Sequence, residues 1–369
     1  MCRHLTLPHR SVLFRAGLRR STAVLGLFAA SLAPAVAADW KVTQGAKEVG
    51  PGQNVSVTVD GRLVARLVYG EGQQKPFVAV YDEQGRAITN AGIGKDGKEA
   101  GIEPHQRGIF VGWKVIESDL GKLEAGLEGT AYKGDYADTW SMANGTTQVL
   151  TEVEKMATND NSASIIAKIE WRAGKKDSSG SNLLLTETRR IRVTKPSNAL
   201  AQVDHTSEFL PARDLRLGAD VQHAGVHMRV DASVYDHIAE TSYLYAPASA
   251  EKAGKPYYRG GLPGATGSVK GDTLKWGEFL FPLHDRWYSV VQMNAIGNPV
   301  EEFSTREYGR FGFFFKGAMA KDEGLRISYR FLVKMAETPA EAPKRSATQA
   351  AKVRQETESA YVKFVHEVR

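Results

Sequence analysis

Apolar and polar side chains alternate along much of this chain, and this pattern limits the folds that it can adopt. The clearest stretches are residues 63–69, 109–115, 163–171 and 325–333. Successive side chains of a β-strand point to opposite faces of its sheet, so such alternation predicts half-buried antiparallel strands. Clusters of Asp, Asn, Gly and Ser separate these stretches, as is typical of turns. The sequence therefore predicts a fold made mostly of antiparallel sheet.

Helical spacing of apolar residues occurs only near the C-terminus, over residues 341–366, with Pro339 and Pro343 near the start, where proline is tolerated. No internal repeat and no long linker divides the chain. These observations predict an all-β fold, a large antiparallel β-sandwich with a C-terminal α-helix. We expect residues 38–369 to form a single domain.

The N-terminal segment, residues 1–37, has the composition of a cleaved export signal. It contains five arginines, then the apolar run 23–32, and it ends in Ala35-Val36-Ala37. The apolar run is shorter than the ~20 residues that a membrane-spanning helix needs. Arg19-Arg20 is followed by residues unlike those of a twin-arginine signal, which favours ordinary secretion. We therefore expect a periplasmic or secreted protein.

Removal of this segment changes what the composition implies. The whole chain has a formal net charge of +6, and the loss of five arginines leaves +1. A nearly neutral mature chain gives no indication of nucleic-acid binding, and we expect no membrane association after cleavage. The only cysteine, Cys2, lies in the same segment, so the mature chain has no disulfide and no thiolate nucleophile or ligand.

Residues 220–231 are the most informative motif. Read as a strand, they place His223, Gly225, His227, Arg229 and Asp231 on one face and apolar residues on the other. Such a face suits a polar, oxygen-rich ligand, and the alternative is a solvated outer face. Four strand residues span about 13 Å, too far for the two histidines to share one metal ion.

A second motif, Glu103-Pro104-His105-Gln106-Arg107-Gly108, precedes the predicted strand at 109–115. A polar turn at a strand entrance is a common place for binding groups. Histidine transfers protons near neutral pH, and arginine forks onto a carboxylate or neighbouring hydroxyls. His105 and Arg107 are therefore candidate site residues, although an ordinary surface loop has the same appearance.

A third motif places Glu187 and Arg189 on the same strand face as Leu185 and Ile191. Charges that point toward an apolar layer need partners, because burial of an unpaired charge is costly. These two residues either line a substrate pocket or form a structural ion pair.

A fourth motif, residues 303–315, places Glu307 and Tyr308 before a strongly aromatic strand. Apolar surroundings raise the pKa of a carboxyl group and make it suitable for acid–base work. Tyr308 and Trp140 also offer flat faces to a sugar ring, although most of the tryptophans are expected in the core.

Five short motifs in order resemble the bacterial PmoA-like family, over most of the chain from Val55 to Val333. They are His105-Gln106-Arg107-Gly108, Asp138-Thr139-Trp140, Glu187-Thr188-Arg189, His223-Ala224-Gly225 with Arg229, and Arg306 to Gly312. The resemblance implies a β-sandwich related to galactose-mutarotase-like folds, and it implies carbohydrate metabolism only by association.

This chain departs from the family pattern at two places. Glu103 stands where the family often has a further histidine, and residues 295–299 replace a His-Pro-x-Asn-Pro stretch. The oxygenase origin of the family name has no support in the residues, because the mature chain has no long apolar span and no histidine at its expected N-terminus.

Together these features predict an exported carbohydrate-active protein with a concave site on a β-sheet. His105, His223 and Glu307 are the candidate acid–base groups of an epimerase, lyase or glycoside-cleaving enzyme. The candidate substrate-binding residues are Arg107, Trp140, Glu187, Arg189, His227, Arg229 and Tyr308. One alternative is a glycan-binding protein without catalysis. Another is a metal-dependent oxidoreductase with a site formed by His105, His223 and Glu307. The sequence specifies neither a cofactor nor the sugar or oligosaccharide.

Overall fold

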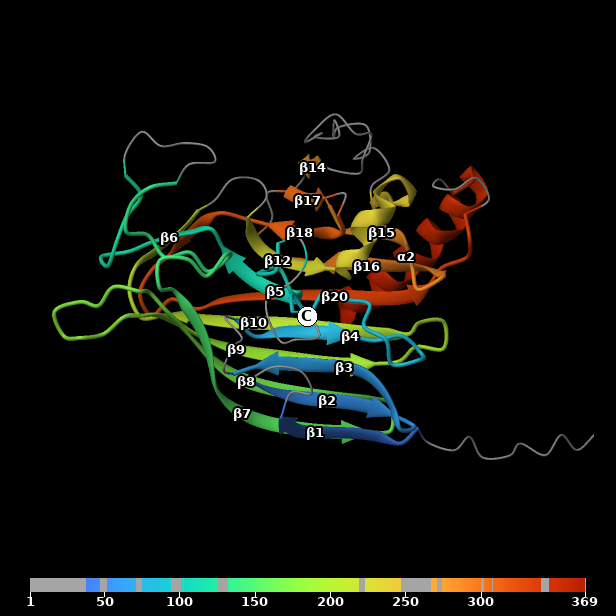
Figure 1. The fold of residues 1–369 in the computed structure, drawn as a ribbon, viewed down its shortest axis with the longest axis horizontal. Coiled ribbons are helices and arrows are strands. Elements are labelled where there is room, and N and C mark those ends of the chain that lie inside the picture. Colours follow the sequence, from blue (N-terminus) through green and yellow to red (C-terminus); the bar gives the residue numbers. More distant parts are fainter. Residues whose placement is uncertain are drawn as a thin grey trace, which may run out of the picture. The chain divides into compact units, whose positions relative to one another are not determined.

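Two large antiparallel sheets dominate the computed structural model of the protein (Figure 1). The structure describes residues 38–46, 52–70, 75–93, 101, 103–124, 132–218, 223–246, 267–270, 274–299, 302–306, 308–339 and 345–368. The predicted export signal, residues 1–37, lies outside these ranges, and so does Glu307.

The first sheet has nine strands and carries the candidate site. In spatial order they are β1 (Trp40–Ala46), β2 (Gln53–Val59), β3 (Arg62–Tyr69), β4 (Phe77–Val80), β5 (Gly108–Trp113), β12 (Ala224–Arg229), β18 (Arg310–Phe314), β17 (Glu302–Arg306) and β14 (Gly267–Lys270). Each strand pairs antiparallel with its neighbours.

The second sheet has eight strands. In spatial order they are β13 (Ser242–Ala246), β15 (Trp276–Leu283), β16 (Arg286–Asn294), β20 (Leu325–Met335), β10 (Ala201–Pro211), β9 (Leu183–Thr194), β8 (Ser162–Arg172) and β7 (Thr147–Asn159). A smaller sheet joins β19 (Gly317–Met319), β11 (Leu215–Gly218) and β6 (Val115–Glu117). The predicted class, a large antiparallel β-sandwich with a C-terminal helix, is confirmed.

The main hydrophobic core is made from the facing sides of the two large sheets. Val111, Val226 and Phe313 contribute from the nine-stranded sheet, and Ile165 and Phe331 contribute from the eight-stranded sheet. The predicted alternating stretches 63–69, 163–171 and 325–333 each lie within one strand, because each has apolar side chains to bury against the opposite sheet. The stretch 109–115 is interrupted at Lys114: β5 ends at Trp113, and Val115 begins β6 of the three-stranded sheet.

The C-terminal helix α2 (Ala347–Glu367) begins six residues after the predicted start at 341. Ser346 caps it: its hydroxyl accepts a hydrogen bond from the Gln349 amide, and the Gln349 side chain accepts one from the Ser346 amide. Tyr361, Phe364 and Val365 pack against the eight-stranded sheet. A short 3₁₀ helix that we did not predict, η1 (Ala232–Glu240), follows β12. Among the described residues, no helix is both long and apolar enough to cross a membrane.

A glycine in β5 allows a turn to lie directly against the nine-stranded sheet. A Cβ atom on Gly112 would lie 2.4 Å from the backbone oxygen of Thr139 and 3.2 Å from the Cα of Trp140. Only glycine therefore allows the turn 138–141 to approach the sheet this closely. This contact fixes where Trp140 lies.

Replacement of Gly112 with alanine should weaken the fold and displace this turn. We expect Gly112→Ala to lower the free energy of unfolding by about 1–3 kcal/mol, since the added methyl group meets backbone atoms. Gly45→Ala is the matched control, because a Cβ there has no atom within 4 Å. Urea unfolding checks both variants, and equal midpoints for the two contradict this account.

Candidate functional site

The candidate site lies on the side of the nine-stranded sheet that faces away from the core, called here the outer face. Strand alternation places Phe110, His227, Arg229 and Arg310 on it, since their neighbours Val226, Met228 and Phe311 belong to the core. The prediction that residues 223–231 present polar groups on one face fits β12. This face is not solvated, because His227, Arg229 and Arg310 have no exposed surface.

Trp140 packs on the outer face and is itself fully buried. Its ring lies 4.8 Å from the ring of His227, 5.0 Å from that of Phe110 and 5.5 Å from that of His223, edge to face in each case. The guanidinium of Arg310 lies 5.4 Å from the Trp140 ring. Since Trp140 has no exposed face on which a sugar could stack, its role in this structure is to support its neighbours.

The carboxylate of Asp138 organises the turn that carries Trp140. It accepts hydrogen bonds from the backbone amides of Trp140 at 3.0 Å and Ser141 at 2.7 Å. It also forms an ion pair of 2.6 Å with the Lys114 ammonium, which in turn donates to the Ser141 hydroxyl. Asp138 is fully buried. One acidic residue therefore fixes both the turn and a lysine beside the site.

Lys75 is a functional candidate that the sequence analysis missed. Its side chain is buried, its ammonium donates a hydrogen bond to the Trp140 carbonyl, and the same ammonium lies 4.3 Å from the centre of the Phe110 ring. Burial lowers the pKa of Lys75 to about 7, and the nearby charges of Arg107, Arg189 and Lys114 lower it further, against the opposing effect of Asp138. This lysine therefore changes its charge near neutral pH.

His105 and His223 lie close enough to influence each other's charge. The side chain of His105 is 19% exposed, 3.6 Å from the carboxylate of Glu103. Burial lowers its pKa to about 3, and the charges of Lys75, Lys114, His223 and Arg107 contribute to this shift. His223 is partly buried beside Trp140, and its backbone oxygen accepts a hydrogen bond from Lys114. His105 is therefore neutral at pH 7, and it lies at the surface of the group.

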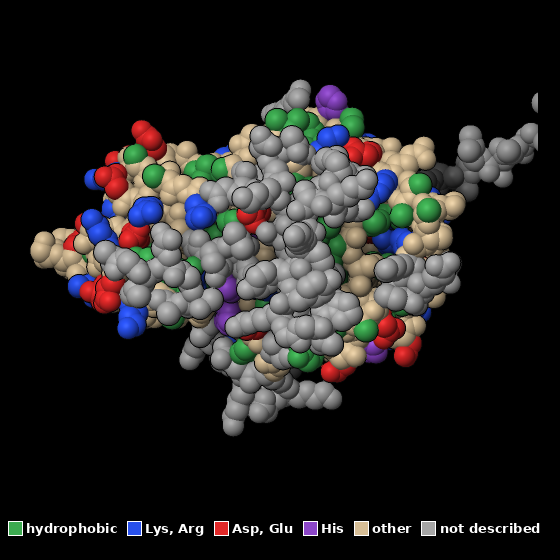
Figure 2. All heavy atoms as spheres, turned by 90° about the horizontal axis from the view of Figure 1, so that it is seen from above, with side chains coloured by type: hydrophobic (Ala, Val, Ile, Leu, Met, Phe, Trp, Pro, Cys, Tyr) green, Lys and Arg blue, Asp and Glu red, His purple; other side chains and the backbone are tan. Residues whose placement is uncertain are grey.

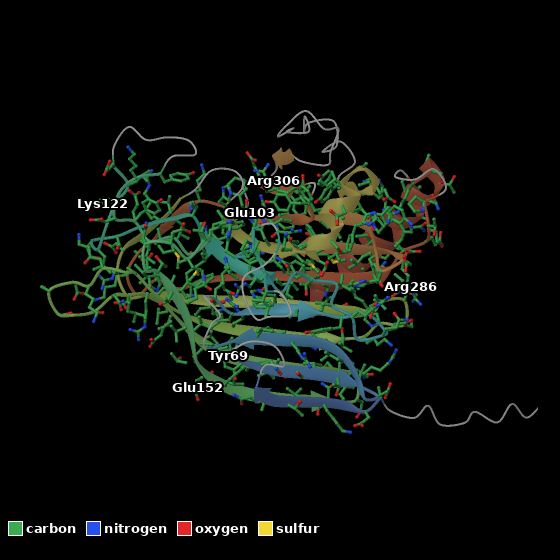
Figure 3. All side chains as sticks on the ribbon, in the orientation of Figure 1. Tyr69, Glu103, Lys122, Glu152, Arg286 and Arg306 are labelled. Atoms are coloured by element: carbon green, nitrogen blue, oxygen red, sulfur yellow. The ribbon has the colours of Figure 1, made fainter. Side chains whose placement is uncertain are left out.

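Figure 2 shows the molecule turned by 90°, with histidine side chains visible near the centre of this view. Figure 3 labels Glu103 and Arg306, both on the part of the molecule where β12, β17 and β18 lie in Figure 1.

Arg107 and His227 are buried, unlike the partly exposed His105 and His223. The Arg107 guanidinium donates to the Pro104 carbonyl at 2.8 Å. His227 places one ring nitrogen 2.6 Å from the Ala224 carbonyl and the other 3.2 Å from Arg310. Burial and the charge of Arg310 hold the pKa of His227 well below its usual value. Both side chains are buried, and a role for either in substrate binding stays a prediction.

Glu187 and Arg189 form a fully buried bidentate ion pair, with N–O distances of 2.8 and 2.9 Å. Ser207 and Trp171 also donate to the Glu187 carboxylate, and Arg189 donates to the Pro76 carbonyl next to Lys75. This arrangement favours the structural alternative, in which the pair ties β9 to the segment that carries Lys75. A direct role in substrate binding stays a prediction.

Arg229 and Tyr308 lie together at the end of β12. The Arg229 guanidinium is 4.7 Å from the centre of the Tyr308 ring and donates to the Tyr308 carbonyl. Burial lowers the pKa of Arg229 to about 10, still high enough to keep it charged at pH 7. The acid–base role of Glu307 stays a prediction, because this residue lies outside the described part of the chain.

The alternative prediction of a metal site has no supporting cluster of ligands among the residues of the described ranges. In them, no three His, Cys, Asp or Glu side chains lie together as metal ligands do. The proposed third ligand, Glu307, lies outside those ranges.

One protein-family model matches most of the chain. A family model described as "Family of unknown function (DUF6807)" matches residues 54–347. The chain belongs to this family. No curated protein matches it. The finer resemblance to PmoA-like proteins stays a prediction, since the DUF6807 description assigns no function.

Several solved structures are distantly similar to this DUF6807 member. A galactose 1-epimerase from Lactobacillus acidophilus shares 7% identity over 81% of this chain and 100% of its own, with a TM-score of 0.40. A GalM/aldose epimerase homologue from C. elegans shares 8% sequence identity, and the match covers 81% of this chain and 100% of the homologue, with a TM-score of 0.33. A glycoside hydrolase family 97 enzyme from Pseudoalteromonas shares 9% sequence identity, and the match covers 74% of this chain and 34% of that enzyme, with a TM-score of 0.36. These scores carry no argument about chemistry, so the fold rests on the strand pairing described above.

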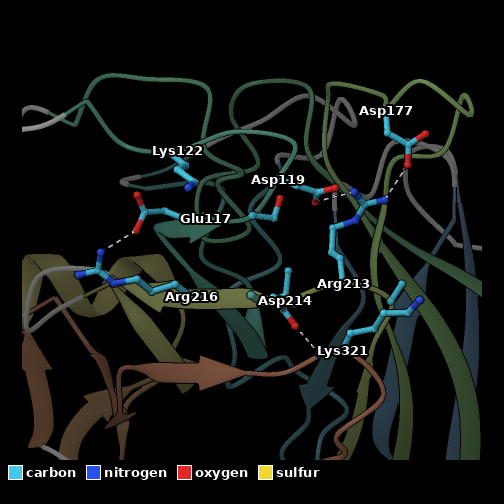
Figure 4. A pocket seen from close by; sticks show the side chains of 11 residues that line it. Glu117, Asp119, Lys122, Asp177, Arg213, Asp214, Arg216 and Lys321 are labelled. Atoms are coloured by element: carbon cyan, nitrogen blue, oxygen red, sulfur yellow. Dashed lines mark hydrogen bonds and ion pairs between the residues drawn. The ribbon is translucent and has the colours of Figure 1, made fainter.

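A separate cavity of about 740 Å³ lies beside the three-stranded sheet of the DUF6807 chain (Figure 4). Arg213 bonds Asp119 and Asp177 across it, and Arg216 bonds Glu117. Its described lining contains no histidine. Since these charges neutralise one another, the outer face of the nine-stranded sheet is the stronger candidate for chemistry.

The buried histidines predict a loss of stability in mild acid. The pKa values of His105 and His205 are lowered to about 3, and that of His227 is also lowered. Below about pH 6.5 the unfolded chain binds protons that the folded chain excludes, so stability falls as pH falls. Each histidine contributes up to ~1.4 kcal/mol per pH unit in this range. Urea unfolding at pH 7, 6 and 5 measures the slope, and His105→Asn should reduce it. An unchanged slope in this variant contradicts the placement of His105.

Proposed function

We propose that the protein binds a sugar or sugar derivative on the outer face and transforms it by acid–base chemistry. One observation carries the proposal: His105 and His223, 118 positions apart in the printed sequence, come together beside a buried Lys75 and Asp138. Groups whose pKa values are strongly shifted by burial and by named charges gather at functional sites more often than elsewhere. Both histidines are partly exposed, so a ligand has access to them.

The protonation state and the position of each residue suggest its role in the proposed reaction. His105 has a pKa of about 3 in the ligand-free protein and is neutral at pH 7, so its ring has an unprotonated nitrogen, and we assign it the part of proton acceptor. His223 lies beside it and supplies the second group that proton transfer to a departing or re-forming oxygen requires. Lys75 donates its ammonium hydrogen bond to the Trp140 carbonyl, so we assign it the part of a positioning residue that holds Trp140. Its charge adds to the effect of burial in lowering the pKa of His105. An epimerase, a lyase and a glycoside-cleaving enzyme each use such a pair.

From the export signal predicted in residues 1–37, we propose that this activity takes place in the periplasm or outside the cell. The alternative function is glycan binding without catalysis. It uses the same surface but requires no proton transfer, so turnover separates the two functions.

A panel of monosaccharides and oligosaccharides tests the proposal, first by thermal shift and then by turnover of each stabilising sugar. We expect His105→Ala and His223→Ala each to lower kcat by about 10²–10⁴-fold, with a smaller change in KM. His237→Ala is the matched control, since His237 lies on η1, exposed and paired with Glu240. It should leave kcat unchanged.

Three results contradict the catalytic proposal. Binding without turnover of any sugar supports the glycan-binding alternative. Equal activity in the His105 and His237 variants removes His105 from the mechanism. The absence of any bound sugar rejects both functions.

A further inference from the structure

Three arginines occupy one row across three neighbouring strands of the outer face. Arg229 of β12 is the register partner of Arg310 of β18, and Arg310 is the register partner of Arg306 of β17. Partners in antiparallel strands project from the same face with their Cβ atoms about 5 Å apart. All three residues are buried, and Arg229 and Arg310 have no exposed surface. Like charges in such a row repel one another unless something neutralises them.

The described hydrogen-bond partners of Arg310 and Arg229 are neutral, and the carboxylate of Asp231 acts on Arg229 through its charge without a described hydrogen bond to it. Arg310 donates to the Ser304 hydroxyl at 3.0 Å and lies 3.2 Å from a ring nitrogen of His227. Arg229 donates to the carbonyls of Val230 and Tyr308. In both guanidiniums the Nε and Nη2 atoms are buried without a hydrogen-bond partner in the described part of the protein. Each therefore has buried donors that the described residues leave unbonded.

Two other buried arginines, Arg189 and Arg330, are neutralised by carboxylates. Arg189 forms two hydrogen bonds with the Glu187 carboxylate. Arg330, 3% exposed, forms two with Asp204 and one with Glu367. A buried charge is costly without such partners. Arg229 and Arg310 thus differ from Arg189 and Arg330 because no described carboxylate bonds to them. A negatively charged ligand would supply that partner.

Positively charged side chains also lie near His105. Lys75, Lys114 and Arg107 each act on His105 as positive charges that lower its pKa, while Asp138 is the buried carboxylate bonded to Lys114. The two parts of the face meet at Trp140, with Arg310 at 5.4 Å and Lys75 at 5.7 Å from its ring. Tyr308, partly exposed, lies against Arg229, so the Arg229 end of the row lies beneath one side chain that must move to admit a ligand.

We infer that the ligand of this site is an anionic sugar, and that Arg310 and Arg229 bind its negative group. The inference rests on the proposed function and adds the substrate class to it. A guanidinium presents parallel N–H donors that match a carboxylate, and it also binds sulfate and phosphate. Within the shared chemistry of an anionic sugar, a uronic acid fits best, because the planar carboxylate accepts the parallel N–H bonds of a guanidinium.

The ligand test compares sugars that differ in charge alone. D-galacturonate and D-glucuronate are measured against D-galactose and D-glucose by thermal shift and calorimetry, at low salt and at 0.5 M NaCl. Galactose 6-sulfate and galactose 6-phosphate are further arms that identify the anion, and sodium acetate measures binding of a carboxylate without a sugar. We expect the uronates to bind at least about tenfold more tightly than the neutral sugars, with a smaller difference at high salt.

The outcomes separate this inference from the proposed function. Neutral sugars that bind as tightly as their acids overturn the inference and leave the proposed function in place. Acetate that binds as tightly as the uronates supports an anion site and contradicts the sugar-binding function. Tighter binding of the sulfate or phosphate ester than of the uronates keeps the anionic class and rejects the carboxylate. No binding in any arm overturns both.

Variants test the arginine row itself. Arg310→Gln should reduce uronate affinity about thirtyfold or more, since it removes the charged fork, and should change galactose affinity by less than about threefold. In the ligand-free protein this variant should not lower the melting temperature, because it removes a buried charge that has no carboxylate partner. Arg330→Gln is the matched control, and it should lower the melting temperature, since it leaves Asp204 unpaired.

A structural role for Arg310 predicts the reverse, a lower melting temperature with uronate affinity unchanged, and this result overturns the inference. If Arg310→Gln fails to fold, Arg229→Gln and Arg310→Lys provide the same comparison. Arg310→Lys keeps the charge but loses the fork, so partial uronate affinity supports the inference and full affinity contradicts the forked contact.

Discussion

The carboxylate of Asp138 is the contact on which the rest of the site depends. It closes the turn at Trp140 and Ser141 through two backbone amides, and it pairs with Lys114 in the same buried space. The turn lies against Gly112, where no larger residue fits, so Trp140 is held on the sheet. The Trp140 carbonyl then receives the Lys75 ammonium. A single acidic group thus positions one aromatic residue and two lysines.

Positive charge in excess of that carboxylate gives the outer face its chemical character. Burial, together with these positive charges, lowers the pKa of His105 to about 3 and that of Lys75 to about 7. His105 is therefore an uncharged base at pH 7, and Lys75 changes its charge near neutral pH. On the same face, the described residues leave guanidinium donors of Arg229 and Arg310 unbonded. The proposed proton transfer and the proposed preference for an anionic ligand therefore rest on one electrostatic arrangement, since a bound anion would both neutralise the arginines and raise the pKa of its neighbours.

Much of the fold could be predicted from the sequence, because alternation at 63–69, 163–171 and 325–333 directly reflects burial against one opposite sheet. The same alternation placed His227 and Arg229 on the outer face. It could not show that this face is buried, because the turn that covers part of it is distant in sequence. Lys75 was missed for the same reason: it lies in a polar segment, and only contact with Trp140, 65 residues later, reveals its environment. The pairing of Glu187 with Arg189 was one of two alternatives, and the choice required the positions of Trp171 and Ser207.

The central claim is that the described residues of the outer face bury more positive charge than their carboxylates neutralise, and the titration of Lys75 tests it most directly. In protein labelled with ¹³C-lysine, the Cε signal of Lys75, assigned by its loss in Lys75→Met, is followed by NMR from pH 5 to 11. The account predicts a midpoint near pH 7 that rises when a uronate binds. A midpoint near 10.5, the ordinary lysine value, would show that the ammonium is solvated or fully neutralised and would contradict the account.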